Sequence, residues 1–307
     1  MHARNIITDI RPWIVIGLIV GLIIGDTGEA PTVAMVTLVI MMCVSLHGLD
    51  FNRSDLKKNR KEVILGILIC YGVAGGVTLL VGSFYSHDLW LGWVMIAAVP
   101  CAISVTSGTL ILKGNTKLAM ITVTAIYLIA LAMTPIMTKV FIGEAISPFE
   151  VLKYVALFIV IPFIVSVPLR KVAINANVKA VSINIMFFVL VCITFGANRE
   201  FIFSEPKTVL WVVAGCLVRI IAVASVMEIV LRWMRTKRDS RIPLVLMSIW
   251  KNSALAMSMT MILISTTESV LPSALSLPLE MIWFMVLIWY YQKRCPPEEE
   301  KASGYDA

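Results

Sequence analysis

Apolar stretches of about twenty residues recur along the whole chain, separated by short polar connections. About twenty residues of α-helix cross a hydrocarbon core of roughly 30 Å, so each stretch is a candidate membrane span. Composition agrees, because 59% of the 307 residues are hydrophobic and 15% are charged. A soluble domain has about 45–50% and 25%. The sequence therefore predicts an all-α polytopic membrane protein, with spans at about 12–26, 32–49, 63–84, 90–112, 118–143, 149–171, 180–198, 207–234, 242–266 and 275–292.

The distribution of lysine and arginine predicts how these spans are oriented. With ten spans, twenty of the 26 basic residues fall on the side that holds both termini and three on the other side. The remaining three, Lys153, Arg219 and Lys251, lie within predicted spans. Basic residues accumulate on the cytoplasmic side of membrane proteins. We therefore expect a multi-pass protein of the cell inner (plasma) membrane with both termini in the cytoplasm. The net charge of +7 is then a topology signal, and we expect no nucleic-acid partner.

Cysteine and histidine give no sign of a cofactor or a metal. The six cysteines are scattered without the paired spacing of a metal site or a disulfide framework, and the three histidines stand singly. No span carries a His-Glu-x-x-His zinc motif or a Gly-x-Ser-x-Gly nucleophile motif. We expect neither a cofactor nor an enzymatic activity.

The ten predicted spans divide into two sets of five at the loop near residue 146. Residues 1–145 form the first five-helix repeat, residues 146–292 the second, and residues 293–307 a cytoplasmic tail. An odd number of spans makes the second repeat enter the membrane in the opposite sense, as in the inverted repeats of many secondary transporters. In such folds, interrupted helices cross and bind the substrate near the midplane.

Polar residues occur at corresponding places in the fourth and ninth spans. In the fourth span Pro100 precedes a polar run, and the ninth span carries polar residues at mid-membrane. A proline kink without a binding role is the alternative, since such kinks are tolerated in membrane helices. The predicted substrate-binding residues are Pro100, Ser104, Thr106, Ser107, Thr109, Lys251, Asn252 and Ser253.

Three segments of the chain resemble the bile acid:sodium symporter family. These are the stretch from Pro100 through Lys113-Gly114-Asn115 to Thr134-Pro135, the segment Lys251-Asn252-Ser253-Ala254-Leu255-Ala256, and Gly48-Leu49-Asp50-Phe51. The resemblance implies a ten-helix fold in which a panel domain packs against a core domain. It also implies alternating access to a site where interrupted helices four and nine cross.

The chain departs from that family at the positions where the resemblance places the ligands of two sodium ions. Ser and Asn after the fourth-helix break, and hydroxyls on the fifth helix, correspond here to Val105, Thr106, Ala119 and Val123. The third-helix and ninth-helix ligands correspond to Cys70, Met247 and Lys251. Most of the side-chain oxygens are lost, and an ammonium at residue 251 would repel sodium. We therefore expect a divergent, sodium-independent member with Lys251 as a fixed cation; protons are the alternative coupling ion.

Three charged residues are predicted deep in the membrane. Lys251 lies about 14 Å and Glu280 about 18 Å from the cytoplasmic face at 1.5 Å per residue, and Arg219 is also deep. A charge at such depth costs about 2.5–3.5 kcal/mol or more and needs a partner. Glu280 and Arg219 are the candidate charge partners, and Lys251 could pair with Glu280. The alternative to a functional Lys251 is a purely structural ion pair.

The function that these features favour is secondary transport of a small organic anion, meaning a carboxylate or sulfonate with an apolar body. The N-termini of broken helices carry partial positive charge that suits an anionic group. Two alternatives stay open: efflux of a metalloid or inorganic anion, and a membrane receptor that does not transport. Membrane lipid is the other expected partner.

Overall fold

The structure is a computed structural model that describes residues 7–46, 57–143, 146–169, 174–264 and 266–293. All regular elements in these ranges are helical. Six helical segments are long and apolar enough to cross a membrane: Arg60–Gly82, Thr116–Ile142, Pro148–Pro168, Ala176–Ala197, Pro206–Trp233 and Glu268–Tyr291. This confirms a polytopic α-helical membrane protein. The segment Gly48–Phe51 and the predicted tail beyond Lys293 lie outside the described residues.

In the first half of the chain each predicted span falls on a helix. The elements are α2 Ile10–Ile24, α3 Ala30–Leu46, α5 Arg60–Ile67, the π-helix η1 Leu68–Ala74, α6 Gly75–Gly82, α7 His87–Ala98, α8 Val105–Ile111 and α9 Thr116–Ile142. The third predicted span is continuous but contains the π-helix, and the fourth is interrupted between α7 and α8.

The second half of the chain contains one helix that the sequence did not predict. The elements are α10 Pro148–Leu169, α11 Ala176–Ala197, α12 Arg199–Ser204, α13 Pro206–Trp233, α14 Arg238–Ile249, α15 Ser253–Leu263, the 3-10 helix η3 Thr267–Val270 and α16 Leu271–Lys293. The short α12 lies in a predicted loop. The ninth predicted span is interrupted between α14 and α15.

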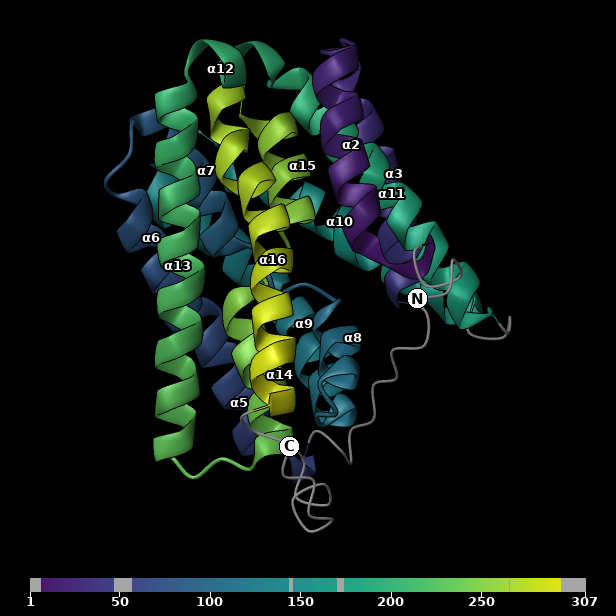
Figure 1. Cartoon of the computed structure of the whole chain (residues 1–307), viewed down its shortest axis with the longest axis vertical. Helices are drawn as coiled ribbons and strands as arrows, with labels where there is room; N and C mark the ends of the chain where they lie inside the picture. The colour runs from purple at the N-terminus through teal and green to yellow at the C-terminus, as the bar shows by residue number, and fades with distance from the viewer. Residues whose placement is uncertain (1–6, 47–56, 144–145, 170–173, 265, 294–307) are drawn as a thin grey trace.

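The helices α2, α3, α10 and α11 pack against one another and form a slanted group beside the other helices (Figure 1). Small residues allow close approach within this group, as is common between membrane helices. A Cβ atom on Gly21 of α2 would lie 2.3 Å from the carbonyl oxygen of Cys192 in α11, so only glycine fits there. The group combines two helices from each half of the chain.

The connection from α13 to α14 and the end of α16 lie at one end of the bundle, and α12 lies at the other (Figure 1). Arg235 and Lys237 belong to that first connection. The arrangement therefore gathers segments that the charge distribution assigns to a common side.

Candidate substrate site at the crossing of two interrupted helices

The two helix interruptions meet in the interior and pair through their backbones. The N–H of Ala102 donates to the carbonyl of Trp250 at 2.8 Å, and the N–H of Asn252 donates to the carbonyl of Pro100 at 2.8 Å. Together they form a short antiparallel bridge between Cys101 and Lys251. Backbone polar groups freed inside a membrane protein must find partners within the protein. Each interruption satisfies groups that the other exposes.

Pro100 explains why α7, the first part of the interrupted fourth span, ends at Ala98. Proline lacks an N–H and disfavours helical geometry in the preceding residue, and Val99 is extended with a ψ of 156°. The hydroxyl of Thr134 on α9 donates to the carbonyl of Ala98 at 2.8 Å. That bond satisfies a carbonyl at the end of α7 and fixes α9 beside the break.

Asn252 explains why the second helix resumes at Ser253. Its Oδ1 accepts from the N–H of Leu255 at 3.1 Å, an N-cap of the kind that asparagine commonly provides. Its Nδ2 donates to the hydroxyl of Tyr127 on α9 at 2.8 Å. The side chain is 6% exposed, so this buried amide connects the start of α15 directly to α9.

The ammonium of Lys251 points to the third span. Its Nζ lies 3.2 Å from the carbonyl oxygen of Cys70, 3.6 Å from the Cys70 sulfur and 4.8 Å from the ring centroid of Tyr71. Lys251 is 1% exposed. Cys70 and Tyr71 belong to the π-helix η1, a distortion that occurs often at functional sites. A carbonyl oxygen and an aromatic face both stabilise a cation.

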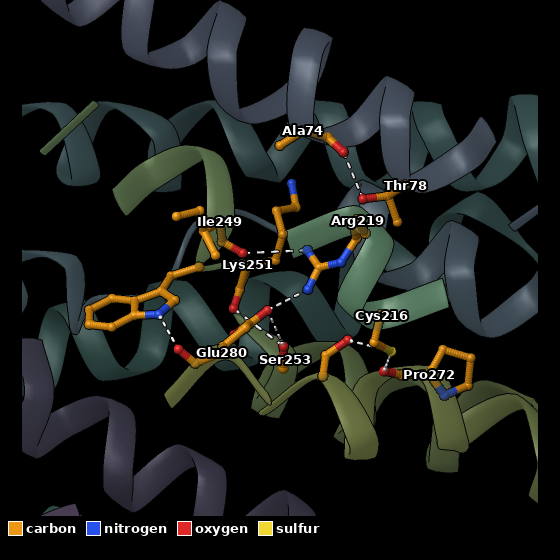
Figure 2. A network of polar contacts seen from close by, with 11 residues as sticks. Ala74, Thr78, Cys216, Arg219, Ile249, Lys251, Ser253, Pro272 and Glu280 are labelled. Atoms are coloured by element: carbon orange, nitrogen blue, oxygen red, sulfur yellow. Dashed lines mark hydrogen bonds and ion pairs between the residues drawn. The ribbon is translucent and has the colours of Figure 1, made fainter. Parts of the chain in front are cut away.

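Glu280 pairs with Arg219 and not with Lys251, whose pairing with Glu280 the sequence left open as a possibility. Nη2 of Arg219 lies 2.6 Å from Oε1 of Glu280, and among the described residues no ion pair joins Lys251 to a carboxylate. Figure 2 shows the reason: the Lys251 ammonium extends away from Glu280, although both residues lie beside the same break.

The Arg219–Glu280 pair spans the interruption of the ninth predicted span. Nη1 of Arg219 donates to the carbonyl of Ile249, the last residue of α14, at 3.4 Å. Oε1 of Glu280 accepts from the hydroxyl of Ser253, the first residue of α15, at 3.5 Å (Figure 2). A cation at a helix C-terminus and an anion at a helix N-terminus both oppose the helix dipole favourably. The pair therefore stabilises both ends of the broken helix.

The chain also matches a known protein family over residues 32–205, more than half of its length, and the matching description is "Sodium Bile acid symporter family". The chain belongs to the sodium bile acid symporter family. No individually curated protein matches it. The family match includes the break between α7 and α8, whereas the break between α14 and α15 lies beyond it. Membership confirms the resemblance noted in the sequence and identifies the chain as a multi-pass membrane transporter.

The crossing unites only some of the predicted substrate-binding residues. Pro100, Lys251 and Asn252 meet there, and Ser253 contacts Glu280. Ser104, which precedes α8, and Thr106 on α8 are partly exposed, and Ser107 on α8 is exposed. Thr109 differs, because it is fully buried and its hydroxyl donates to the carbonyl of Val105 at 2.7 Å. In this structure Thr109 therefore packs inside the protein, and its role in substrate binding stays a prediction.

Most of the positions that the family resemblance assigns to sodium ligands hold buried side chains without oxygen; Thr106, which is partly exposed and keeps its hydroxyl, is the exception. Val105, Ala119, Val123, Met247 and Cys70 are all 0% exposed. In the described part of the chain, the ammonium of Lys251 donates to the main-chain oxygen of Cys70 at 3.2 Å and to its sulfur at 3.6 Å.

Tyr71 and Tyr127 were not among the predicted site residues, although each contacts one of them. The Tyr71 ring faces Lys251, and the Tyr127 hydroxyl accepts from Asn252. A tyrosine in the middle of an apolar span is a usable signal, because a buried phenol usually has a hydrogen-bond partner. The sequence does not reveal which partner, since Asn252 is 125 positions away.

Proposed function

We propose that this protein is a secondary transporter that carries small organic anions across the inner membrane by alternating access. The observation that carries the proposal is the hydrogen-bonded crossing of the two interrupted helices, with a buried ammonium beside it. The start of α15 contributes partial positive charge, and Lys251 contributes a full one. An anionic group is the ligand that such a crossing would favour.

The inverted repeat of five and five helices is part of the proposal. The interruptions occur in the fourth predicted span of each half, at α7/α8 and at α14/α15. The group of α2, α3, α10 and α11 takes the first two predicted spans of each half. Both correspondences support two equivalent halves, residues 1–145 and 146–292. The group would then be the panel, and the remaining helices the core that moves against it.

Sodium independence is the second part of the proposal. The family resemblance places a sodium ligand at position 70, and here the main-chain oxygen of Cys70 accepts from Lys251 at 3.2 Å. A tethered ammonium would supply the positive charge that a bound sodium ion supplies elsewhere, without being carried across. Uniport, exchange or proton coupling would then drive the substrate.

Counterflow in proteoliposomes tests the proposed function. Vesicles loaded with unlabelled benzenesulfonate are diluted into labelled benzenesulfonate, a permanently charged probe that crosses bare lipid slowly. A transporter gives a transient accumulation of label that protein-free vesicles lack. A receptor would bind the label without exchange, and an enzyme would change its chemistry. The experiment is repeated with other sulfonates and with carboxylates. Binding without exchange for all of them, or chemical change of the label, would overturn the proposal.

A further inference from the structure

An apolar cavity of about 140 Å³ lies between α9 and α10. Its walls include Val123, Tyr127 and Leu131 from α9 and Ile159, Val160 and Phe163 from α10. Helix α10 belongs to the slanted group, whereas α9 packs against the interrupted helix α7. The cavity therefore lies where the two parts of the molecule meet.

The polar side chains that line this cavity already have hydrogen-bond partners within the protein. Besides Tyr127, the polar side chain among the lining residues is Thr124, whose hydroxyl donates to the carbonyl of Met120 at 2.8 Å. The Tyr127 hydroxyl is engaged by Asn252 at 2.8 Å. A charged or strongly polar group would lose its hydration here without compensation. The cavity is suited to the apolar part of a molecule.

Tyr127 connects this cavity to the helix crossing. Its ring forms part of the cavity wall, and its hydroxyl contacts the residue that caps α15. A ligand whose anionic group lies at the start of α15 could therefore extend past Tyr127 and place its body between α9 and α10.

We propose that the cavity receives the apolar body of the transported anion and limits that body to about the size of one six-membered ring. This inference rests on the proposed function and specifies its substrate class. A cavity of about 150 Å³ with similar walls holds a benzene molecule, so the volume here accommodates a phenyl ring or a short branched chain. A four-ring steroid body is far too large. The substrate class is therefore monocyclic or short branched sulfonates and carboxylates, not bile acids.

A lipid acyl chain is the competing occupant. Leu128 and Val160, which also line the cavity, are 49% and 36% exposed on the outer surface. An acyl chain would have no reason to depend on the crossing, whereas the body of an anion would lie next to its own charged group. The contact between Tyr127 and Asn252 therefore favours the anion.

Binding of three sulfonates to the purified full-length protein tests the proposal. Methanesulfonate, benzenesulfonate and taurocholate share the anionic group and differ in the size of the body. Burying a methylene strengthens binding roughly threefold to fourfold, so benzenesulfonate should bind at least tenfold more tightly than methanesulfonate. Taurocholate should bind more weakly than benzenesulfonate. Tightest binding of taurocholate would overturn the size limit.

Two cavity variants and a control locate the effect. Ile159→Phe fills the cavity and should weaken benzenesulfonate binding at least tenfold, while methanesulfonate binding stays within about twofold. Ile164→Phe adds the same volume on α10 at a residue that is 62% exposed, and should change neither. Because Ile159→Phe could prevent folding, Phe163→Ala enlarges the cavity instead and should shift preference toward naphthalenesulfonate.

The outcomes separate this proposal from the proposed function. If benzenesulfonate exchanges in counterflow but Ile159→Phe and Phe163→Ala leave the size preference unchanged, the cavity assignment is overturned and transport stands. If both variants change only the amount of copurified phospholipid, the occupant is lipid and the assignment is overturned. If no sulfonate or carboxylate exchanges at all, the proposed function itself fails.

Discussion

Lys251 directs its ammonium to the main-chain carbonyl oxygen of Cys70, 3.2 Å away, across an interval of 181 residues. The lysine lies in the break between α14 and α15, and the cysteine lies in the π-helix of the third predicted span. This contact connects the crossing of the two interrupted helices to the third predicted span. Among the described residues a carbonyl oxygen and an aromatic ring, and no carboxylate, hold this ammonium.

Substituting Lys251 by glutamine should lower anion transport without creating a dependence on sodium. Glutamine is the residue that the family resemblance implies at this position, but the other ligand positions still hold Met247, Val105 and Val123. We expect the initial rate of benzenesulfonate counterflow to fall at least tenfold. Thermal unfolding in detergent serves as the control for folding. A Lys251→Gln protein that transports as fast as the parent would show that the ammonium has no role in the site.

Substituting Glu280 by glutamine should destabilise the protein strongly. The change leaves the guanidinium of Arg219 buried at 1% exposure without its carboxylate, and breaking a buried pair costs about 3–5 kcal/mol. The double change Arg219→Met with Glu280→Met should recover most of that loss, because two apolar side chains replace both charges. Unfolding midpoints in detergent measure the effect.

The matched control for that pair is Lys251→Met in the Glu280→Gln background. Since Lys251 is not the partner of Glu280, Lys251→Met should change the free energy of unfolding by the same amount in this background as in the parent. A clearly more favourable change in the Glu280→Gln background would mean that Glu280 pairs with Lys251 after all.

The sequence could predict the fold class and the interruptions, but not which way each helix faces. The length of each apolar stretch and the positions of lysine and arginine are visible in the sequence itself, so they predict the spans without any knowledge of tertiary contacts. Pro100 and the polar residues near Asn252 marked the breaks for the same reason. The depths of Lys251 and Glu280 could be estimated from the rise per residue, yet depth gives no rotation about the helix axis. The sequence therefore could not decide whether Lys251 and Glu280 pair, and in the structure their charged groups point in different directions.

Three further features had no signal in the sequence. The π-helix at Leu68–Ala74 lies in a uniformly apolar span, where one extra residue in a turn leaves the composition unchanged. The helix α12, Arg199–Ser204, is shorter than any span. The cavity between α9 and α10 depends on how two helices from different halves pack, which no local pattern specifies.

Asn252→Ala should reduce both stability and anion affinity, and Tyr127→Phe should separate the two effects. Loss of the cap at Leu255 costs about 1 kcal/mol, and the lost bond to Tyr127 costs about as much again. Tyr127→Phe removes the second bond alone and keeps the ring in the cavity wall. We expect Asn252→Ala to weaken benzenesulfonate binding more than Tyr127→Phe does. Unchanged binding in Asn252→Ala would remove the start of α15 from the site.

Accessibility of single cysteines tests the proposed topology. Ser86, in the connection before α7, and Lys237, in the connection before α14, are both exposed, and we assign them to opposite sides of the membrane. In a cysteine-free background, an impermeant maleimide applied to intact cells should label Ser86→Cys and spare Lys237→Cys. Permeabilised cells should show labelling of both, which controls for reactivity. Labelling of Lys237→Cys in intact cells would reverse the orientation.

The most direct test of the account is the initial rate of benzenesulfonate uptake into proteoliposomes in sodium and in choline, at equal ionic strength and pH. The account predicts equal rates in the two salts, because the ammonium of Lys251 already occupies the carbonyl of Cys70 and most of the side-chain oxygens of the family's sodium sites are replaced. A saturable increase of the rate with sodium concentration would contradict it, since a carried sodium ion would then supply the charge that we assign to Lys251.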